Sequence, residues 1–454
     1  MKRCKFYHII LSACILAQIA CENSQLSDII GDESSKVEIG YVAKLGPNAA
    51  TLIWSCTLSS QGIVYSTNGI FPSLKRSKKH SFELQNLQPN TEYSVILTCG
   101  SQTMAEGEPV SFRTWISNDP PKTRGIWIVG GIGSQSSPLP EIDLFDPVTN
   151  TWYSSITSVP TPRVFASIVS HKSKIYVIGG LEYISGVYVS SSKVEEYDPY
   201  SNTWQTKSPL PFGSQGAVAG SVGDEIYILS GSNSPDMTNG PVFNTILKFY
   251  PDLGASGQWI SYSVTPTIFA RVDMAGCAID GAIFYTGGRT YNTGSANATT
   301  DAFIPSANST TSLSEPTLGE SKHGAGGLCI NPSPQDPFPT DGEWFAVFGG
   351  STASGNLQQP VTSISASNKT EFYQLGAGTF AAGPTLPSSL YYPASQISYE
   401  TRKIFVFGGA SAINIPNNSV YSLSSANPIL SAWTTESLPM PRSRYAHKAV
   451  RIDR

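Results

Sequence analysis

Arginine and tyrosine side chains between the apolar segments are the residues of this chain best suited to recognition chemistry. A guanidinium group can bind a carboxylate through two parallel hydrogen bonds, and tyrosine combines a large contact area with one polar tip. We therefore predict a binding surface formed by these residues, with a purely structural role of the arginines, bridging neighbouring repeats, as the alternative. The candidates are Arg163, Arg271, Arg289, Arg442, Arg444, Tyr183, Tyr188 and Tyr291.

Catalytic and metal-binding patterns find little support in the sequence. The five histidines, at positions 8, 80, 171, 323 and 447, show no paired spacing typical of a metal site, and no Gly-x-Ser-x-Gly turn is present. We predict no catalytic residue, metal or cofactor. The net charge of −4 gives no overall positive field, so nucleic acid is not an expected partner.

The first twenty residues carry the signature of an export signal. A basic start, Met1–Lys5, precedes an apolar run that is too short for a comfortable membrane span. The following Ile19-Ala20-Cys21 resembles a bacterial lipobox, although Gln18 departs from its usual leucine. The resemblance implies lipidation at Cys21 and a location at the cell envelope or outer surface of a bacterium; cleavage by an ordinary signal peptidase is the alternative.

Glycine, proline and short alternating apolar runs favour an all-β protein. Between residues 37 and 116 these runs predict a β-sandwich. The segment Leu84–Val95, with Tyr93, resembles the tyrosine corner of fibronectin type III domains, and Leu52-Ile53-Trp54 resembles their core tryptophan strand. The resemblance implies a fibronectin type III-like domain over these 80 residues.

Four cysteines remain after the signal segment and Cys21. Strand periodicity places Cys56 and Cys99 on inward faces of this domain, so we predict a disulfide between them that stabilises it by about 2 to 4 kcal/mol. Cys277 and Cys329 fall on equivalent strands of later repeats but one register apart, hence on opposite faces. This register argues against a second disulfide.

From residue 125 onward, one unit recurs six times. Its marker is an apolar strand that ends in a glycine pair, at spacings of 49, 51, 57, 62 and 59 residues. The six copies are residues 126–131, 175–180, 226–231, 283–288, 345–350 and 404–409, where Ser230 replaces one glycine.

Tryptophan and Asp-Pro turns recur in phase with these strands, and the whole pattern resembles the kelch repeat. The resemblance implies a six-bladed β-propeller. The C-terminal tail, Arg444–Asp453, is similar to the innermost strand that other repeats place before their glycine pair. We therefore expect it to complete the first blade and close the ring.

In such a ring, the loops after the glycine pairs and the connectors between blades emerge at the same end, where binding residues are usually found. We predict a surface-anchored binding or adhesion protein that recognises an extracellular protein or a glycan there. One alternative is a secreted sugar-converting enzyme similar to kelch-type sialic acid mutarotases, using Arg163, Arg271, Glu182 and Arg289; another is a structural spacer. The predicted segments are residues 1–20 (signal), 21–36 (polar tether), 37–116 (sandwich), 117–124 (linker) and 125–454 (propeller).

Overall fold

The chain forms two compact units, residues 1–115 and 116–454. The computed structural model describes residues 35–66, 69–73, 76–89, 91–114, 121–234, 242–262, 270–290, 296–307, 309–313, 316–331, 343–353, 364–412 and 414–452. The predicted signal segment, Cys21 and Tyr291 lie outside the described residues. In the described part no helix is long and apolar enough to cross a membrane.

The first unit is a sandwich of two antiparallel sheets, with strand orders β1-β2-β5 and β4-β3-β6-β7. Alternate residues of β2 and β6 point inward, so Trp54, Val95 and Leu97 are buried between the sheets. The elements are β1 (Val37–Leu45), β2 (Ala50–Ser60), β3 (Gly62–Ser66), β4 (Gly69–Pro72), β5 (Ser77–Leu84), β6 (Glu92–Cys99), the short 3-10 helix η1 (Met104–Glu106) and β7 (Glu108–Arg113).

Two features predicted for this sandwich are present in the structure. A disulfide joins Cys56 on β2 to Cys99 on β6, and thereby connects the two sheets. The Tyr93 hydroxyl accepts a hydrogen bond from the Gln88 backbone N–H at 2.8 Å, as a tyrosine corner does. Both contacts hold β6 to another part of the unit.

The described part of the second unit contains six four-stranded antiparallel sheets, and the all-β prediction is confirmed. We number them 1 to 6 along the chain. From the innermost strand outward they are sheet 1 (β36-β8-β9-β10), sheet 2 (β12-β13-β16-β17), sheet 3 (β18-β19-β20-β21), sheet 4 (β22-β23-β24-β25), sheet 5 (β26-β27-β28-β29) and sheet 6 (β30-β31-β34-β35).

The strands of sheets 1 to 3 are β8 (Ile126–Val129), β9 (Glu141–Asp146), β10 (Thr151–Ser158), β12 (Ser167–His171), β13 (Lys174–Ile178), β16 (Val194–Asp198), β17 (Thr203–Lys207), β18 (Val218–Val222), β19 (Glu225–Leu229), β20 (Ile246–Tyr250) and β21 (Gln258–Tyr262). Sheets 4 to 6 contain β22 (Ala275–Ile279), β23 (Ala282–Thr286), β24 (Thr300–Ile304), β25 (Ser309–Leu313), β26 (Gly326–Ile330), β27 (Trp344–Phe348), β28 (Thr370–Gln374), β29 (Phe380–Ala382), β30 (Ala394–Ser398), β31 (Lys403–Phe407), β34 (Val420–Ser424) and β35 (Thr434–Thr435). Two small extra sheets are built from β11 (Arg163–Val164), β14 (Leu181–Ile184) and β15 (Val187–Ser190), and from β32 (Ala410–Ala412) and β33 (Ile415–Pro416). A 3-10 helix, η2 (Pro305–Ala307), follows β24.

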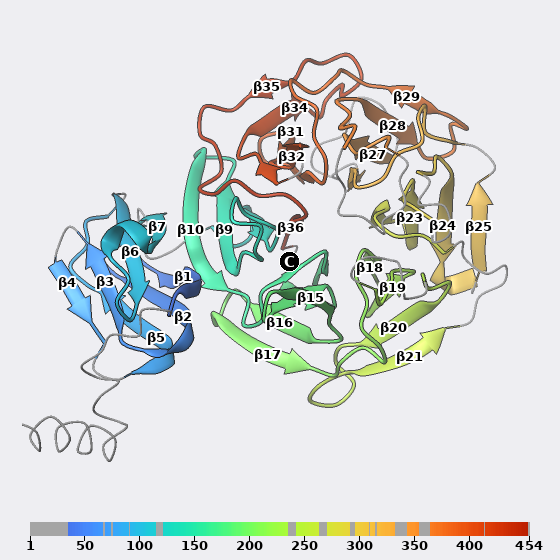
Figure 1. Cartoon of the computed structure of the whole chain (residues 1–454). Helices are drawn as coiled ribbons and strands as arrows, with labels where there is room; N and C mark the ends of the chain where they lie inside the picture. Colours follow the sequence, from blue (N-terminus) through green and yellow to red (C-terminus); the bar gives the residue numbers. More distant parts are fainter. Residues whose placement is uncertain are drawn as a thin grey trace, which may run out of the picture. The chain divides into compact units, whose positions relative to one another are not determined.

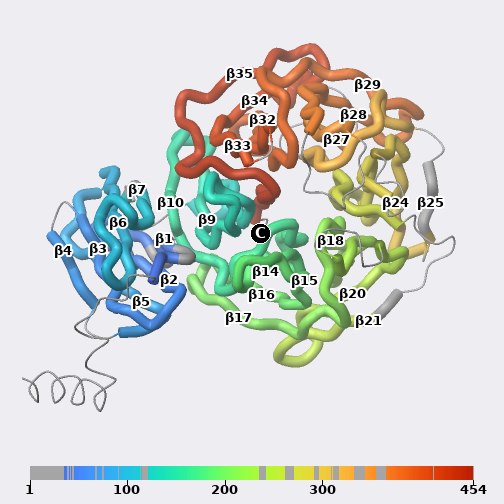
Figure 2. The backbone as a smooth tube through the Cα atoms, viewed as in Figure 1, coloured from blue at the N-terminus to red at the C-terminus, as the bar shows by residue number. Residues whose placement is uncertain are grey.

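The six sheets surround a common axis in chain order, an arrangement that fits a β-propeller (Figures 1 and 2). Sheet 1 combines strands from both ends of the unit, because β36 (Lys448–Arg451) pairs with β8. Each innermost strand contacts the next one around the axis, and β36 contacts both β12 and β30. The beginning and the end of the second unit are therefore joined within sheet 1.

Each glycine pair follows the second strand of its sheet and lies beside the connector that leads to the next sheet. In the pair at the end of β13, the Gly180 N–H donates to the Ser214 carbonyl of that connector at 2.7 Å. A Cβ on Gly180, whose φ is +96°, would lie 2.8 Å from the Val164 carbonyl oxygen. Glycine is needed here because backbone approaches backbone in a left-handed conformation. Ser230 tolerates the first position because its hydroxyl donates to the Phe243 carbonyl at 2.7 Å.

A disulfide between Cys277 on β22 and Cys329 on β26 corrects our prediction against this pairing. The two residues do occupy opposite faces of their own sheets, as the register indicated. In consecutive sheets of a ring, however, the forward face of one sheet packs against the rear face of the next. Both cysteines belong to the apolar cluster between sheets 4 and 5, so opposite faces bring them together.

Candidate functional site

The predicted binding arginines Arg163, Arg271 and Arg444 are buried, and each binds an acid of its own sheet. Arg163 contacts Glu195 at 2.8 Å, and Arg444 contacts Asp143 at 2.5 Å. Arg271 pairs with Asp301 in the same way. Burial lowers the pKa of the three guanidinium groups, and the facing carboxylates oppose this effect.

Each of these arginines also donates to backbone carbonyls of the same sheet. Arg163 donates to the Val177 carbonyl at 3.0 Å, Arg271 to the Gly287 carbonyl at 2.8 Å and Arg444 to the Gly130 carbonyl at 3.0 Å. Their terminal Nη1 and Nη2 groups are thus engaged inside the fold. The geometry supports the structural alternative with one change: the arginines tie a connector to the sheet that follows it, whereas we had expected a bridge between neighbouring sheets.

These contacts belong to a repeated position that sequence reasoning missed. We call the residue four positions before each innermost strand the anchor position. Its partner position is the residue of the third strand that pairs with the next-to-last residue of the second strand. The anchor and partner residues of sheets 1 to 6 are, in order, Arg444 and Asp143, Arg163 and Glu195, Ser214 and Leu247, Arg271 and Asp301, Lys322 and Glu371, and Leu390 and Tyr421. A buried cation occurs with an acid in four sheets, and neither occurs in sheets 3 and 6.

Arg289 and Arg442 have acid partners as well. Arg289, after the glycine pair of sheet 4, pairs with Asp273; burial would lower the pKa of Arg289, but the charge of Asp273 outweighs burial and raises it. Arg442 contacts Asp143 at 2.5 Å and the Ser155 hydroxyl at 2.5 Å. All five predicted arginines are therefore held in ion pairs within the unit.

The ring end at the connectors is narrowed by six residues that we call the collar. They stand two positions before the innermost strands, and all have left-handed backbones with φ between +49° and +66°. The N–H of one collar residue donates to the carbonyl of the preceding one in five successive steps, at 2.7 to 3.2 Å. The collar residues are Phe165, Gly216, Asp273, Gly324, Tyr392 and Ala446.

The side chains of two collar residues contact each other, since the rings of Phe165 and Tyr392 lie 5.1 Å apart. The connectors and the loops after the glycine pairs do meet at this end, as isolated bridges such as Val272–Arg289 and His323–Ser351 show. The collar residues therefore lie at the end of the unit where the described parts of these loops and connectors meet.

The residues assigned to that enzyme alternative are engaged in the fold. Glu182 accepts hydrogen bonds from the Ser191 hydroxyl at 2.6 Å and from Lys193 at 2.8 Å. Burial raises the pKa of Glu182, but these two donors outweigh it and the net shift is downward. Arg163, Arg271 and Arg289 are paired with acids as well, so all four residues assigned to the enzyme alternative have partners within the unit.

The tyrosines Tyr183 and Tyr188 lie on a β-hairpin, β14–β15, at the collar end. One face of the hairpin is fixed, because the Tyr188 hydroxyl donates to the Ser136 carbonyl at 2.8 Å and its ring packs beside Ile132, Val164 and Leu181. The other face carries Ile184 paired with Val187, and Glu182 paired with Val189. Ile184, Val187 and Val189 are 49%, 59% and 43% exposed, and Tyr183 is 49% exposed.

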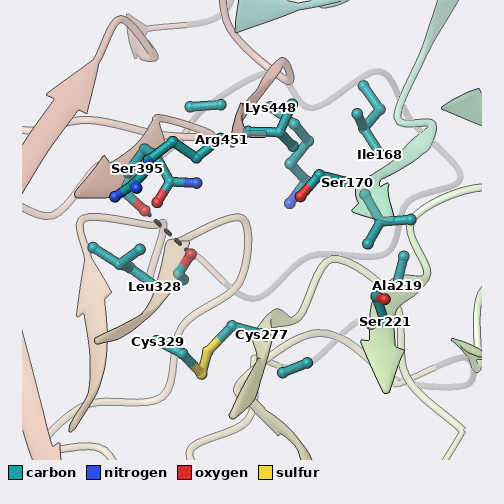
Figure 3. A pocket seen from close by; sticks show the side chains of 18 of the residues that line it. Ile168, Ser170, Ala219, Ser221, Cys277, Leu328, Cys329, Ser395, Lys448 and Arg451 are labelled. Atoms are coloured by element: carbon teal, nitrogen blue, oxygen red, sulfur yellow. Dashed lines mark hydrogen bonds between the residues drawn. A yellow bond between two sulfur atoms is a disulfide. The ribbon is translucent and has the colours of Figure 1, made fainter. Parts of the chain in front are cut away.

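A cavity of about 410 Å³ lies along the ring axis, between the innermost strands of all six sheets. Figure 3 looks into it and labels Ser170, Ser221, Ser395, Lys448 and Arg451 among the surrounding residues. We did not predict this cavity, because a strand residue reveals its sheet face in sequence but not its distance from a ring axis. Within the described residues no cluster of three metal-ligating side chains occurs.

Comparison with known proteins gives local similarities. Residues 162–211 match the Kelch motif, which covers sheet 2 and the start of the next connector. Beta-scruin of Limulus polyphemus is 29% identical over 111 residues, 24% of this chain and 12% of that protein. Kelch-like protein 35 of Mus musculus is 27% identical over 164 residues, 36% of this chain and 25% of that protein.

Kelch-like protein 7 of Rattus norvegicus is 33% identical over 93 residues, 20% of this chain and 15% of that protein. The matches therefore span at most a quarter of the length of these three relatives. Kelch repeats generally mediate contacts between proteins, which agrees with a binding role. Taken with the glycine-pair strands and the ring of sheets, the motif match and these similarities support a kelch-repeat protein.

Proposed function

We propose that this protein binds an extracellular protein partner through the exposed face of hairpin β14–β15. The observation that carries the proposal is the row of three exposed aliphatic side chains, Ile184, Val187 and Val189, on one face of the hairpin. Single exposed apolar residues are ordinary on a protein surface, but a contiguous group marks a contact site.

The rigidity of the hairpin supports this proposal. Ser185 and Gly186 form its two-residue turn with φ of +51° and +87°, which matches the twist of the flanking strands. Tyr188 holds the opposite face to the loop after β8. A partner would lose little free energy in ordering such a preformed surface.

The test is binding of the full chain to an array of extracellular matrix proteins and to a glycan array. Val187→Glu and Ile184→Glu should abolish saturable protein binding, since a charge would be buried in an apolar contact. The matched control is Val148→Glu, because Val148 is 50% exposed in a different turn of the same unit. Equal binding by hairpin and control variants would place the contact elsewhere. Binding to glycans alone would favour a carbohydrate partner instead.

The finer architecture is also part of our proposal. We regard the six sheets as the blades of one closed kelch propeller, supported by the pairing of β36 with β8 and by the contacts of β36 with its neighbours. We regard the first unit as a fibronectin type III-like domain, supported by its three- and four-stranded sheets and by the Tyr93 hydrogen bond.

We further propose that the protein is exported and attached to a membrane through a lipid on Cys21. The support is the apolar N-terminal segment and the small residue before the cysteine. Expression in a bacterium with a labelled fatty acid should give a labelled membrane-bound protein, and Cys21→Ala should give an unlabelled, released one. Labelling that persists in the variant would exclude Cys21 as the attachment point.

A further inference from the structure

The axial cavity has an unusual distribution of charge. Its described lining contains the basic side chains Lys172, Lys448 and Arg451 and no aspartate or glutamate. Small residues and hydroxyls, such as Ser170 and Ser221, make up much of the remaining wall. A cavity of this composition is wide enough for a small molecule and attracts negative charge.

Lys448 differs from the other two basic side chains around the cavity in its contacts. Lys172 pairs with Asp224 at 2.8 Å and Asp252 at 2.7 Å, and Arg451 lies 4.6 Å from the Tyr399 ring centre and 3.9 Å from Glu400. The Lys448 ammonium makes no hydrogen bond or ion pair with the described residues, although Asp273 exerts a weaker attraction from further away.

The buried cations at the anchor positions differ from Lys448 in their partners. Arg163, Arg271, Lys322 and Arg444 each have an acid in contact. A cation without such a partner loses part of its hydration and gains no ion pair in return. Burial accordingly lowers the pKa of Lys448, against the attraction of Asp273.

The two ends of the cavity differ in access. The collar narrows the end near Lys448, the first residue of β36, whereas Arg451 and the β12–β13 turn with Lys172 stand toward the other end. A ligand would therefore enter past Arg451 and Lys172 and meet Lys448 inside. Three residues of extended strand separate the Cα atoms of Lys448 and Arg451 by roughly 10 Å.

We infer that this channel binds a small, hydroxyl-bearing organic anion, with its carboxylate or phosphate group at Lys448 and its hydroxyls against the serine-lined wall. The inference is independent of the hairpin surface, since none of the hairpin side chains lines the cavity.

Isothermal titration calorimetry with gluconate, inorganic phosphate and the neutral sugar glucose tests the inference on the full chain. We expect saturable binding of gluconate or phosphate and none of glucose, and the stronger of the two anions identifies the oxyanion preferred. Lys448→Met should weaken the affinity by about ten- to a hundredfold, the range for losing one charged hydrogen bond, and Lys448→Arg should retain most of it. Lys193→Met is the matched control and should bind as the unsubstituted protein does.

Lys448→Met should also melt no lower than the unsubstituted protein, because it removes an unpaired cation, so lost binding cannot be attributed to unfolding. Equal affinity for glucose, equal affinity of the Lys448→Met variant, or absence of heat with both anions up to about 10 mM would overturn the inference. Val187→Glu should leave anion binding unchanged whatever its effect on protein binding.

Discussion

Sheets 1, 2, 4 and 5 secure their connectors with a buried cation and an acid, whereas sheets 3 and 6 do so with neither. In sheet 6 the same two positions hold Leu390 and Tyr421, which belong to one apolar cluster. In sheet 3 they hold Ser214 and Leu247. The anchor and partner positions thus hold either a complete ion pair or two uncharged residues.

The physical reason lies in desolvation. Two buried opposite charges roughly offset the free energy of removing them from water, but one alone does not. Loss of either partner is therefore costly, while loss of both is tolerated. This desolvation cost explains why the arginines that resemble ligand-binding groups in the sequence are paired with acids inside the structure.

The largest effect should come from breaking one anchor pair. Arg271→Met leaves the Asp301 carboxylate buried beside carbonyls that have lost their donor, and we expect the free energy of unfolding to fall by about 3 to 5 kcal/mol. Chemical denaturation of the full chain measures it. The control is Leu390→Met at the same position of sheet 6, where a volume-conserving apolar change should cost less than about 1.5 kcal/mol. Similar losses at both sites would remove the distinction between the two kinds of sheet.

Sheets 4 and 5 are also joined by Cys277–Cys329, and removing this disulfide should give the next largest effect. Cys277→Ala with Cys329→Ala should lower the free energy of unfolding of the second unit by about 2 to 4 kcal/mol, because the bond closes a long loop in the unfolded chain. Reduction of the unsubstituted protein should reproduce the loss. Cys56→Ala with Cys99→Ala, the control, should affect only the first unit; an unchanged second unit in the first variant would contradict the prediction.

A double substitution tests whether the anchor and partner residues of sheet 4 act as one unit. Arg271→Ser with Asp301→Leu copies the sheet 3 pair into sheet 4. We expect it to recover most of the stability lost in Arg271→Met and to end within about 2 kcal/mol of the unsubstituted protein, since no buried charge is left unpaired. Denaturation of the single Asp301→Leu variant completes the cycle. Additive losses would show that the pair is not a coupled unit.

A smaller effect concerns His323, which follows the anchor residue Lys322. Its ring lies 3.3 Å from the Tyr391 hydroxyl and 3.2 Å from the Ala353 carbonyl, and burial together with Arg289 lowers its pKa to about 3. As the pH falls, this imidazole therefore binds a proton near pH 6.5 in the unfolded chain but only near pH 3 in the folded chain. Stability from this group is therefore full above pH 6.5 and falls by about 1.4 kcal/mol per pH unit below it.

His323→Asn should remove that share of the pH dependence between pH 6.5 and 5.0. The comparison is made by urea denaturation across this range, where carboxylates remain largely ionised. His171 and His447, whose pKa values are also lowered chiefly by burial, retain their own shares in the variant. An identical slope in the variant would mean that His323 takes up its proton in the folded state.

The features that could be predicted from the sequence are those that depend on short-range patterns in the chain. The glycine-pair strands, the tail strand at residues 448–451 and the Cys56–Cys99 bond depend on local alternation and repetition, and the structure has them where those patterns placed them. The anchor pairs were within reach too, because aligning the repeats shows a cation and an acid occurring together or not at all. Considered one at a time, the arginines fit either a binding or a structural role, and only the aligned repeats favour the structural one.

Other features depend on how sheets far apart in the sequence pack around the axis, and they leave no local trace in the sequence. The meeting of Cys277 with Cys329 requires knowing that the opposite faces of neighbouring sheets meet. The position of Lys448 beside the axis depends on all six innermost strands at once. Only the assembled second unit shows that this lysine lacks the acid that anchor cations have.

The smallest effect on stability should come from the hairpin, where the predicted binding tyrosines lie and no anchor is involved. Val187→Glu changes a side chain that is 59% exposed, so the free energy of unfolding should change by less than about 0.5 kcal/mol. The same substitution should abolish protein binding, whereas Arg271→Met should alter binding only as far as it unfolds the chain. Denaturation and binding measured on the same samples separate the two cases. A stabilised or strongly destabilised Val187→Glu variant would mean that the hairpin face packs within the unit and is not the free contact surface that its exposure indicates.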